Sequence, residues 1–421
     1  MGRHRLSLPA ALVLVGLAAG VATLVLRPRS GLIEPAAVDK TAYFSARELE
    51  RAEAYRGPQR VLGVAGLLVS GGTLALIALR PSRRVRRALE RAARRPLLGG
   101  AGAGAGLSLV LSAVALPLGA VSHARAVDVG LSTQSWGFWL SDLVKASALG
   151  ALFAAGGAAG AVALARRFPR HWWAPGAAVI SAVSVAFVFA APLVLDPIFN
   201  RFTPLPAGEL RSDVLSLAQR SGVSVGEVYR IDASRRTTAV NAYVGGLGTS
   251  KRVVLYDTLI DDLEPAEVRS VVAHELAHQR FDDLPKGLLW LAVVIVPAAY
   301  LAQRLTERLV PPDARGSPAM LPALALSVAL VSFAVGSAGN VLSRQVEARA
   351  DAFALDLTRD PAAFIGLERG LATRNVSDPD PPHALHLLFG THPTTLERIG
   401  YGEAWRASRP GVIRPDTRAG S

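Results

Sequence analysis

The sequence predicts a mainly α-helical, polytopic membrane protein with about seven transmembrane helices and a small α+β domain. Three observations indicate this fold class: 51% of the 421 residues are hydrophobic, 19% are charged, and the mean hydropathy is +0.32. The hydrophobic residues form long runs, which excludes collagen, coiled-coil and short-repeat solenoid architectures. The sequence has no cysteine, which excludes disulfide bonds, thiolate metal sites and cysteine nucleophiles.

Seven hydrophobic runs approach or exceed the roughly 20 residues that an α-helix needs to cross a bilayer. They lie at residues 6–26, 61–79, 96–122, 146–165, 172–195, 287–303 and 316–343. The first run is long for a secretory signal and lacks a small-x-small cleavage site, so we interpret it as a retained span. The third opens with the glycine-rich run Gly99–Gly106, which favours close helix packing in lipid; a flexible linker is the alternative.

Basic residues mostly flank these runs. The formal net charge is +13, and the longest basic segment, residues 80–95, joins the second and third runs. This short connector has no interleaved aromatic residues, so it does not indicate a nucleic-acid partner. We expect the lipid bilayer to be the partner of these charges, and the location to be a cell membrane that the chain crosses several times.

A polar insert at about 197–286 separates the fifth and sixth runs. Residues 207–221 have the pattern of an amphipathic helix, and residues 227–232 that of a strand. Residues 237–244 and 252–256 are typical of a hairpin around Gly245–Gly248. The segment 344–372 is again predicted to be helical.

The expected domain organisation follows from these patterns. A five-helix membrane region (1–196) is followed by a protease-type insert (197–286) and two further membrane helices (287–343). The carboxyl-terminal part of the insert's domain (344–405) and a disordered tail (406–421) complete the chain.

The segment that indicates catalysis is His274-Glu-Leu-Ala-His278, on a helix expected to begin near Pro265. Residues four apart lie on one helix face, so His274 and His278 can bind one zinc ion. Glu275 is rotated by about 100° and would lie beside the metal. A carboxylate there can accept a proton from water, which predicts a general base.

A catalytic zinc site needs a third protein ligand, and the best candidate is Glu347 on the helix that leaves the seventh run. Asp351 is one turn further along the same face. It could accept a hydrogen bond from the second nitrogen of a zinc-binding imidazole and thereby fix its orientation. Arg344 could pair with either carboxylate or face anionic lipid. We therefore expect one Zn²⁺ per chain.

Five segments in this order resemble the type I CAAX prenyl endopeptidases, a family of integral-membrane zinc metalloproteases to which the bacterial protease HtpX is more distantly related. The segments are NAYVGGLG, KRVVLYDTLI, HELAH, SRQVEARADAF and FGTHPTTLERI. The resemblance implies a zincin-type metalloprotease domain. It also implies that His274, His278 and Glu347 are the zinc ligands, that Glu275 is the general base, and that Asp351 supports a ligand.

Further roles follow from the resemblance alone. Asn241 and Tyr243 match a position that holds the substrate backbone beside an edge strand. His392 matches a residue that stabilises the tetrahedral intermediate, a role that suits an imidazole because amide hydrolysis builds negative charge on the carbonyl oxygen. The sequence departs from the eukaryotic pattern at Gln279-Arg280, where an aromatic residue is usual, and this leaves the substrate open.

The orientation in the membrane is open between two readings. The amino terminus and connectors on one side carry 16 basic residues, and those on the other side carry nine. The positive-inside rule then predicts a cytoplasmic amino terminus and, with seven spans, a metal site outside the cytosol. The family resemblance implies a metal site that faces the cytosol.

The function predicted from the sequence is therefore a membrane-embedded zinc metalloendopeptidase. Its substrates would be membrane-associated peptides or proteins, in CAAX-type processing or in quality control of membrane proteins. The alternative is a noncatalytic scaffold or transporter that retains a structural zinc. Glu275 argues against this alternative, because a structural site does not use a carboxylate beside an open coordination position.

Overall fold

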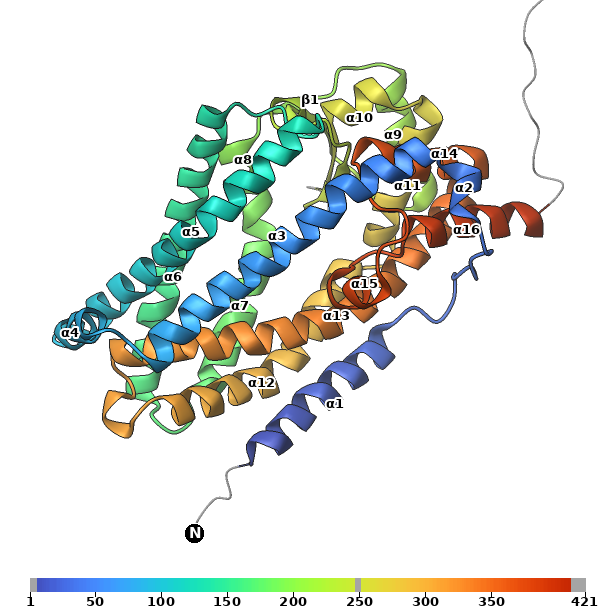
Figure 1. Ribbon diagram of the computed structural model, residues 1–421. Coiled ribbons are helices and arrows are strands. Elements are labelled where there is room, and N and C mark those ends of the chain that lie inside the picture. The colour runs from blue at the N-terminus through green and yellow to red at the C-terminus, as the bar shows by residue number, and fades with distance from the viewer. Residues whose placement is uncertain (1–5, 247–250, 410–421) are drawn as a thin grey trace, which may run out of the picture.

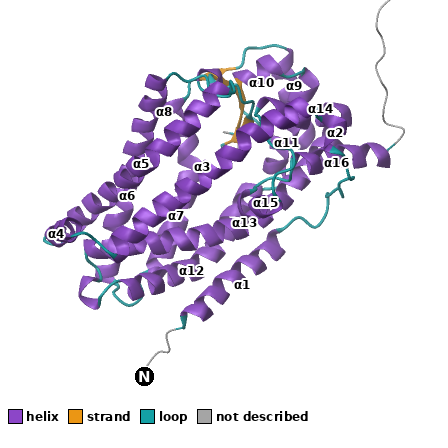
Figure 2. Ribbon diagram, viewed as in Figure 1, coloured by secondary structure: helices purple, strands orange, loops and turns teal. Residues whose placement is uncertain are grey.

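The computed structural model describes residues 6–246 and 251–409. Within them, seven helices are long and apolar enough to cross a membrane, as the sequence predicted. They are α1 (Leu8–Leu26), α3 (Ala46–Leu79), α5 (Pro96–Asp128), α6 (Trp136–Arg167), α7 (Trp173–Val194), α12 (Asp283–Leu309) and α13 (Leu321–Thr358). Figure 1 shows these helices running along a common direction, and Figure 2 shows that the strands gather at one end of them.

Several of these helices extend well beyond the hydrophobic runs that predicted them. Helix α3 begins at Ala46 instead of residue 61, where Ser45 and Glu48 form a capping box. Arg56 on the added turns donates to the carbonyl oxygens of Asn375 and Val376, both at 2.6 Å. Helix α13 likewise continues to Thr358. A hydropathy pattern detects the lipid-facing part of a helix and misses these polar extensions, which the small domain holds.

Helices α5 and α6 pack closely through the glycine-rich run. A Cβ atom at Gly104 would lie 2.4 Å from the carbonyl oxygen of Ala154, and one at Gly100 would lie 3.2 Å from the Val162 side chain. Because the run is helical and lies against α6, the close-packing interpretation is confirmed and the flexible-linker alternative is wrong.

The small domain contains a four-stranded sheet in the order β1-β2-β4-β3. The strands are β1 (Phe202–Pro204), β2 (Glu227–Ile231), β3 (Ala242–Gly245) and β4 (Arg252–Tyr256). Strands β3 and β4 form the expected antiparallel pair, with Ala242 opposite Leu255, whereas β2 and β4 are parallel. Strand β1 was not predicted, because it has three residues and ends in proline.

Helices α9 (Glu209–Ser221), α10 (Asp257–Asp262) and α11 (Pro265–Arg280) complete the core of this domain. Buried residues of α9 and α11, among them Leu217, Val272 and Leu276, pack on Val253 and Leu255 of the central strand β4. Helix α11 is therefore held against the sheet, and this fixes where its histidines lie.

The carboxyl-terminal helices are α14 (Pro361–Arg374), α15 (His383–Phe389) and α16 (Thr395–Ser408). The continuous helix expected at 344–372 is interrupted, because Arg359 has a φ of 56° and Asp360 caps α14. Helix α16 includes the first residues of the segment expected to be disordered from 406, so that boundary was too early. The rest of the expected tail, residues 410–421, lies outside the described residues.

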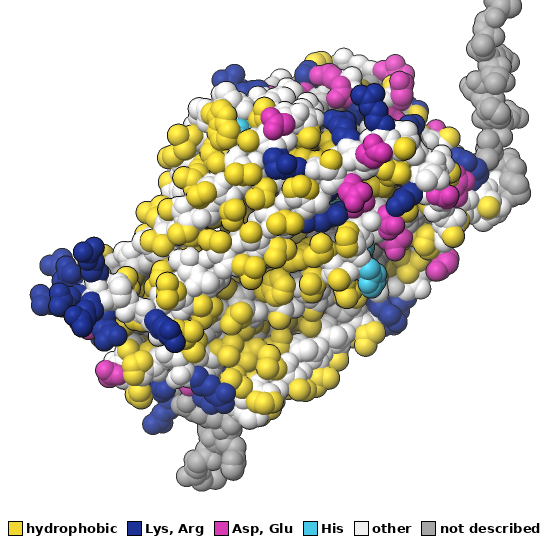
Figure 3. Space-filling view, in the orientation of Figure 1, with side chains coloured by type: hydrophobic (Ala, Val, Ile, Leu, Met, Phe, Trp, Pro, Cys, Tyr) yellow, Lys and Arg dark blue, Asp and Glu magenta, His cyan; other side chains and the backbone are white. Residues whose placement is uncertain are grey.

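The two ends of the bundle differ in composition. The short helix α4 (Arg83–Ala92) and the connectors α6–α7 and α12–α13 lie at one end, and the sheet with α9–α11, α14 and α16 lies at the other, whereas α15 packs alongside α13. In Figure 3 the end around α4 is mainly basic, whereas acidic and basic side chains mix at the other. The remaining short elements are α2 (Lys40–Tyr43), α8 (Asp196–Phe199), η1 (Ala233–Arg235), η3 (Pro312–Ala314) and η4 (Pro318–Met320).

Candidate active site

Helix α11 carries the histidine motif and begins where the sequence predicted. Pro265 occupies its first turn, and Glu264 and Glu267 form a reciprocal cap. Val272 and Leu276 face the sheet, so the face that carries His274 and His278 turns toward α13.

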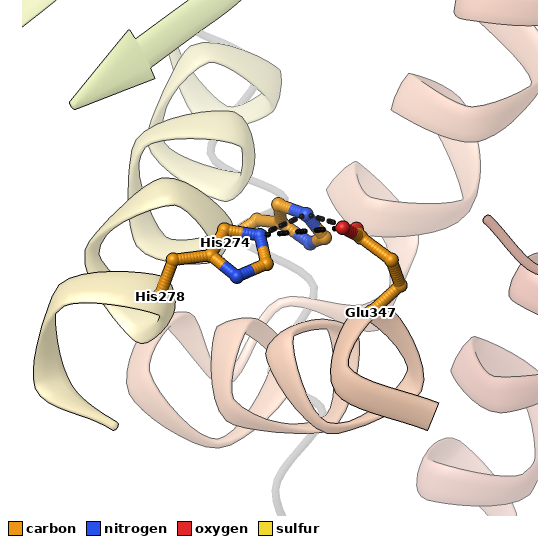
Figure 4. A group of neighbouring side chains, drawn as sticks. All are labelled: His274, His278 and Glu347. Atoms are coloured by element: carbon orange, nitrogen blue, oxygen red, sulfur yellow. Dashed lines mark hydrogen bonds and ion pairs between the residues drawn. The ribbon is translucent and has the colours of Figure 1, made fainter. Parts of the chain in front are cut away.

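Three side chains from α11 and α13 converge at one point. Figure 4 shows the imidazoles of His274 and His278 and the carboxylate of Glu347 pointing toward one another. The Nε2 atoms of the two histidines are 3.3 Å apart, and Glu347 Oε2 is 3.1 Å from His274 Nε2. A tetrahedral ion with bonds of about 2.0–2.1 Å separates its ligand atoms by about 3.3 Å. The spacing of these donors therefore fits one zinc ion.

A carboxylate contacts the far nitrogen of each imidazole. His274 Nδ1 lies 2.8 Å from Asp351 Oδ1, and His278 Nδ1 lies 3.1 Å from Asp283 Oδ2. Such contacts make each ring present Nε2 to a metal and hold its orientation. The sequence indicated Asp351 by its helical spacing from Glu347. It gave no signal for Asp283, which starts the next helix.

Asp351 is fully buried and is held by Arg398 of α16. The guanidinium donates to both oxygens of Asp351, at 2.6 and 2.8 Å, and to Glu368 Oε2 at 2.8 Å. Burial raises the pKa of Glu368 to about 7. The negative charge of Asp351 acts in the same direction, whereas the charge of Arg398 opposes the shift. Sequence reasoning missed Arg398 and Glu368, since no local pattern distinguishes them from solvated helix charges.

These carboxylates strongly affect the protonation of His274. Burial alone would lower its pKa, but the hydrogen bonds with Asp351 and Glu347 outweigh burial and raise the pKa of His274 to about 10. A divalent cation must displace that proton before it can bind. The buried negative charge of this cluster therefore favours a cation, and protons compete for the same position.

Glu275 follows His274 and is rotated away from the ligand direction. Burial raises its pKa above the ordinary value. Within the described part of the chain, its carboxylate has no hydrogen bond to another side chain or to the backbone. A carboxylate with a raised pKa and free oxygens is suited to take a proton from water.

His392 lies on the loop between α15 and α16. Its Nε2 is 3.4 Å from Glu347 Oε2, and its side chain is 57% exposed. Partial burial lowers the pKa of His392. Arg344 donates to the carbonyl oxygen of Gly390 at 2.6 Å, so it supports this loop; of the two alternatives raised for it, a pairing with Asp351 or Glu347 is not found among the described residues.

Asn241 and Tyr243 lie at the edge of the sheet nearest to α11. Strand β3 is an edge strand, and the Val244 carbonyl oxygen accepts a hydrogen bond from Gln279 of α11 at 3.2 Å. The Tyr243 hydroxyl donates to Asp196 at 2.9 Å, and its ring packs with Ile231 and Val254. Its side chain thus has partners within the domain. Because the Val244 carbonyl points away from β4, the backbone groups that face the free edge are those of Ala242 and Val244.

Two family models match consecutive parts of the chain. The model of peptidase family M48 matches residues 204–405, and the model of the CAAX prenyl protease N-terminal domain, described as five membrane helices, matches residues 42–201. The second model agrees with the membrane region that precedes the sheet.

Relatives and a solved structure agree with the two family-model matches. An uncharacterized metalloprotease, YhfN of Bacillus subtilis, is 29% identical over 87% of this chain and 88% of its own. CAAX prenyl protease 1 of Saccharomyces cerevisiae is 34% identical, but the match spans 41% of this chain and 38% of the yeast protein. The crystal structure of S. mikatae Ste24p shares the fold, with a TM-score of 0.77 and 18% identity over 95% of this chain and 100% of that one. Residues 204–405 therefore correspond to peptidase family M48, and the chain is a multi-pass membrane metallopeptidase.

Proposed function

We propose that the chain is a zinc endopeptidase that hydrolyses membrane-associated polypeptides. The observation that carries the proposal is the convergence of His274, His278 and Glu347 at tetrahedral spacing, with Glu275 adjacent and without a side-chain hydrogen bond among the described residues. When bound, the zinc ion would polarise the scissile carbonyl and make water acidic enough to ionise near neutral pH.

The protein's own side chains would perform the proton transfers. Glu275 accepts a proton from the attacking water and then delivers it to the leaving amine. His392, which lies within reach of Glu347, donates a hydrogen bond to the oxygen on which negative charge develops. Asp351 and Asp283 keep the two imidazoles oriented throughout.

The substrate would bind as an extended segment along β3. This strand forms the edge of the sheet, and its Val244 carbonyl already accepts a hydrogen bond from Gln279. A peptide added to this edge, beside Asn241 and Tyr243, would bind mainly through its backbone. Such binding selects weakly for side chains and suits both proposed substrate classes, prenylated chain ends and damaged membrane proteins.

The Glu275→Gln variant tests the mechanism. Purified in detergent, it should keep stoichiometric zinc by elemental analysis and lose at least about 100-fold in the rate of hydrolysis of an unstructured peptide. The exposed Glu209→Gln variant serves as control and should keep both. Unchanged hydrolysis in Glu275→Gln would refute the assignment of the base, and full zinc occupancy in Glu347→Ala would refute the third ligand.

The substrate class needs a cellular experiment. Membrane proteomes of cells that express the wild type and cells that express Glu275→Gln should differ in a set of full-length proteins that accumulate with the variant. Accumulated proteins with prenylated ends would support processing, whereas accumulated misfolded membrane proteins would support quality control.

A further inference from the structure

A groove with a volume of about 710 Å³ lies between α1, α7 and α12, at the end of the bundle opposite the sheet. Its two long walls are helix faces. Residues of α1 and α12 at helical spacing line these walls: Leu14, Leu17, Ala18, Val21, Val293, Val296, Pro297 and Tyr300. Its size is typical of a binding pocket for a small molecule.

The walls of the groove are apolar and are not covered by protein. The other face of α1 packs in the bundle, where Ala11 and Val15 contact Ala298 and Leu301 of α12. On the groove face, by contrast, the side chain of Leu17 is 58% exposed. Because these helices are membrane spans, the walls face hydrocarbon chains.

The groove ends in a polar mouth. Gln303 is buried there and holds the connector before α7, since it donates to the Arg170 carbonyl and accepts from the Trp173 amide, both at 3.0 Å. The connector is thereby fixed with the side chains of Arg170 and His171 exposed at the mouth. Arg304 completes it from α12.

The charge of this mouth is positive. Arg304 donates to Glu307 at 2.9 Å, while its Nε atom is buried without a hydrogen-bond partner among the described residues. No carboxylate within residues 6–246 and 251–409 pairs with Arg170. Among the described residues that line the groove, two guanidinium groups and no carboxylate thus lie where the two apolar walls end.

We propose that this groove binds an anionic phospholipid. An acyl chain would lie between α1 and α12, and the phosphate would contact Arg170 and Arg304, because guanidinium groups bind phosphate oxygens through paired donors. Phosphatidylglycerol fits this mouth better than phosphatidylcholine, whose headgroup brings a cation beside the two arginines. The bound lipid would connect α1 to the start of α7.

Native mass spectrometry of the delipidated full-length chain in detergent tests this proposal. The wild type should retain phosphatidylglycerol in preference to phosphatidylcholine of the same acyl chains. Arg170→Gln should reduce that preference by about fivefold. Arg83→Gln is the matched control, because Arg83 is exposed on α4 at the same end and lies outside the groove.

A second pair of variants tests the walls. Ala18→Trp fills the groove and should abolish retention, whereas Leu12→Trp, an exposed position on the opposite side of α1, should leave it unchanged. Equal retention of both lipids, equal effects of Arg170→Gln and Arg83→Gln, or retention by Ala18→Trp would each overturn the proposal. A dimer that Ala18→Trp disrupts, with no lipid retained by the wild type, would assign the groove to a second copy and also overturn it.

Discussion

Replacing Asp351 with asparagine tests the proposed role of this residue in orienting a metal ligand separately from its role in stability. In the wild type, Asp351 accepts hydrogen bonds from His274 and from two nitrogens of Arg398, at 2.6–2.8 Å, in a fully buried position. Asparagine keeps the shape, but it has one acceptor oxygen for three donors. The far nitrogen of His274 or the guanidinium must therefore lose a partner.

The magnitude depends on Glu368. Removing one partner of a buried ion pair typically costs about 3–5 kcal/mol of stability. Here Arg398 keeps a second carboxylate, because Glu368 Oε2 lies 2.8 Å away. The pKa of Glu368, about 7 in the wild type, should fall once Asp351 no longer repels its ionised form. We therefore expect a stability loss of only about 1–2 kcal/mol, below the range for an uncompensated charge.

Metal affinity should not be compensated in this way, because Glu368 does not contact His274. Loss of the carboxylate that orients a metal-binding imidazole typically lowers metal affinity by about 10- to 100-fold. Chelator competition would measure this affinity, and thermal unfolding in detergent would measure stability. Asp351→Asn combined with Glu368→Gln should destabilise by more than the sum of the two single changes. An additive double variant, or a metal affinity in Asp351→Asn within twofold of the wild type, would refute the reasoning.

Three further predictions test other parts of the structure. Burial raises the pKa of Glu368 to about 7 from an ordinary 4.5. Between these pH values the folded state therefore holds a proton that the unfolded state has released. The free energy of unfolding should then fall by up to ~3 kcal/mol as the pH rises from 4.5 to 7. Thermal unfolding at both pH values should show this fall in the wild type and not in Glu368→Gln. Arg344→Ala should lower kcat about tenfold with zinc content unchanged, because it releases the loop that carries His392; a lowered zinc content would contradict this. Since the chain has no cysteine, Ala88→Cys and Ser216→Cys can be labelled singly, and labelling from the same side of the membrane would exclude seven spans.

The same labelling decides between the two orientations. The positive-inside rule predicts that Ala88→Cys is labelled from the cytoplasm, because α4 lies at the basic end of the bundle. The family resemblance implies that Ser216→Cys is the cytoplasmic position.

The membrane spans and the proposed ligands His274 and His278 could be predicted because each has a local signature. A span requires a long apolar run, and two ligands on one helix require a spacing of four residues. The start of α3 could not be predicted in this way, because its polar first turns depend on contacts with the small domain. Hydropathy therefore gave the number of spans correctly, but five of the seven predicted runs were shorter than the corresponding helices.

The support of the site was less predictable than its ligands. Arg398 is 47 residues from Asp351, and Asp283 belongs to a different helix from the histidine that it contacts. The sequence does not show whether an arginine is exposed or buried, and Arg398 becomes buried only when α16 packs beside α13. Asp351 was found because it shares a helix with Glu347, whereas Arg398 and Asp283 share no pattern with the residues that they hold.

The balance of charge explains why a cation belongs between α11 and α13. Asp351 and Glu368 contact the guanidinium of Arg398, and Glu347 and Glu275 are buried beside His274, so a single guanidinium cannot neutralise all four carboxylates. Without a metal, protonation of His274 supplies the missing positive charge, and this is why its pKa rises to about 10. A divalent ion replaces that proton and adds a further charge, so metal binding should strengthen as the pH rises. Because its ligands come from both helices, the free energy of metal binding also stabilises the packing of α11 on α13.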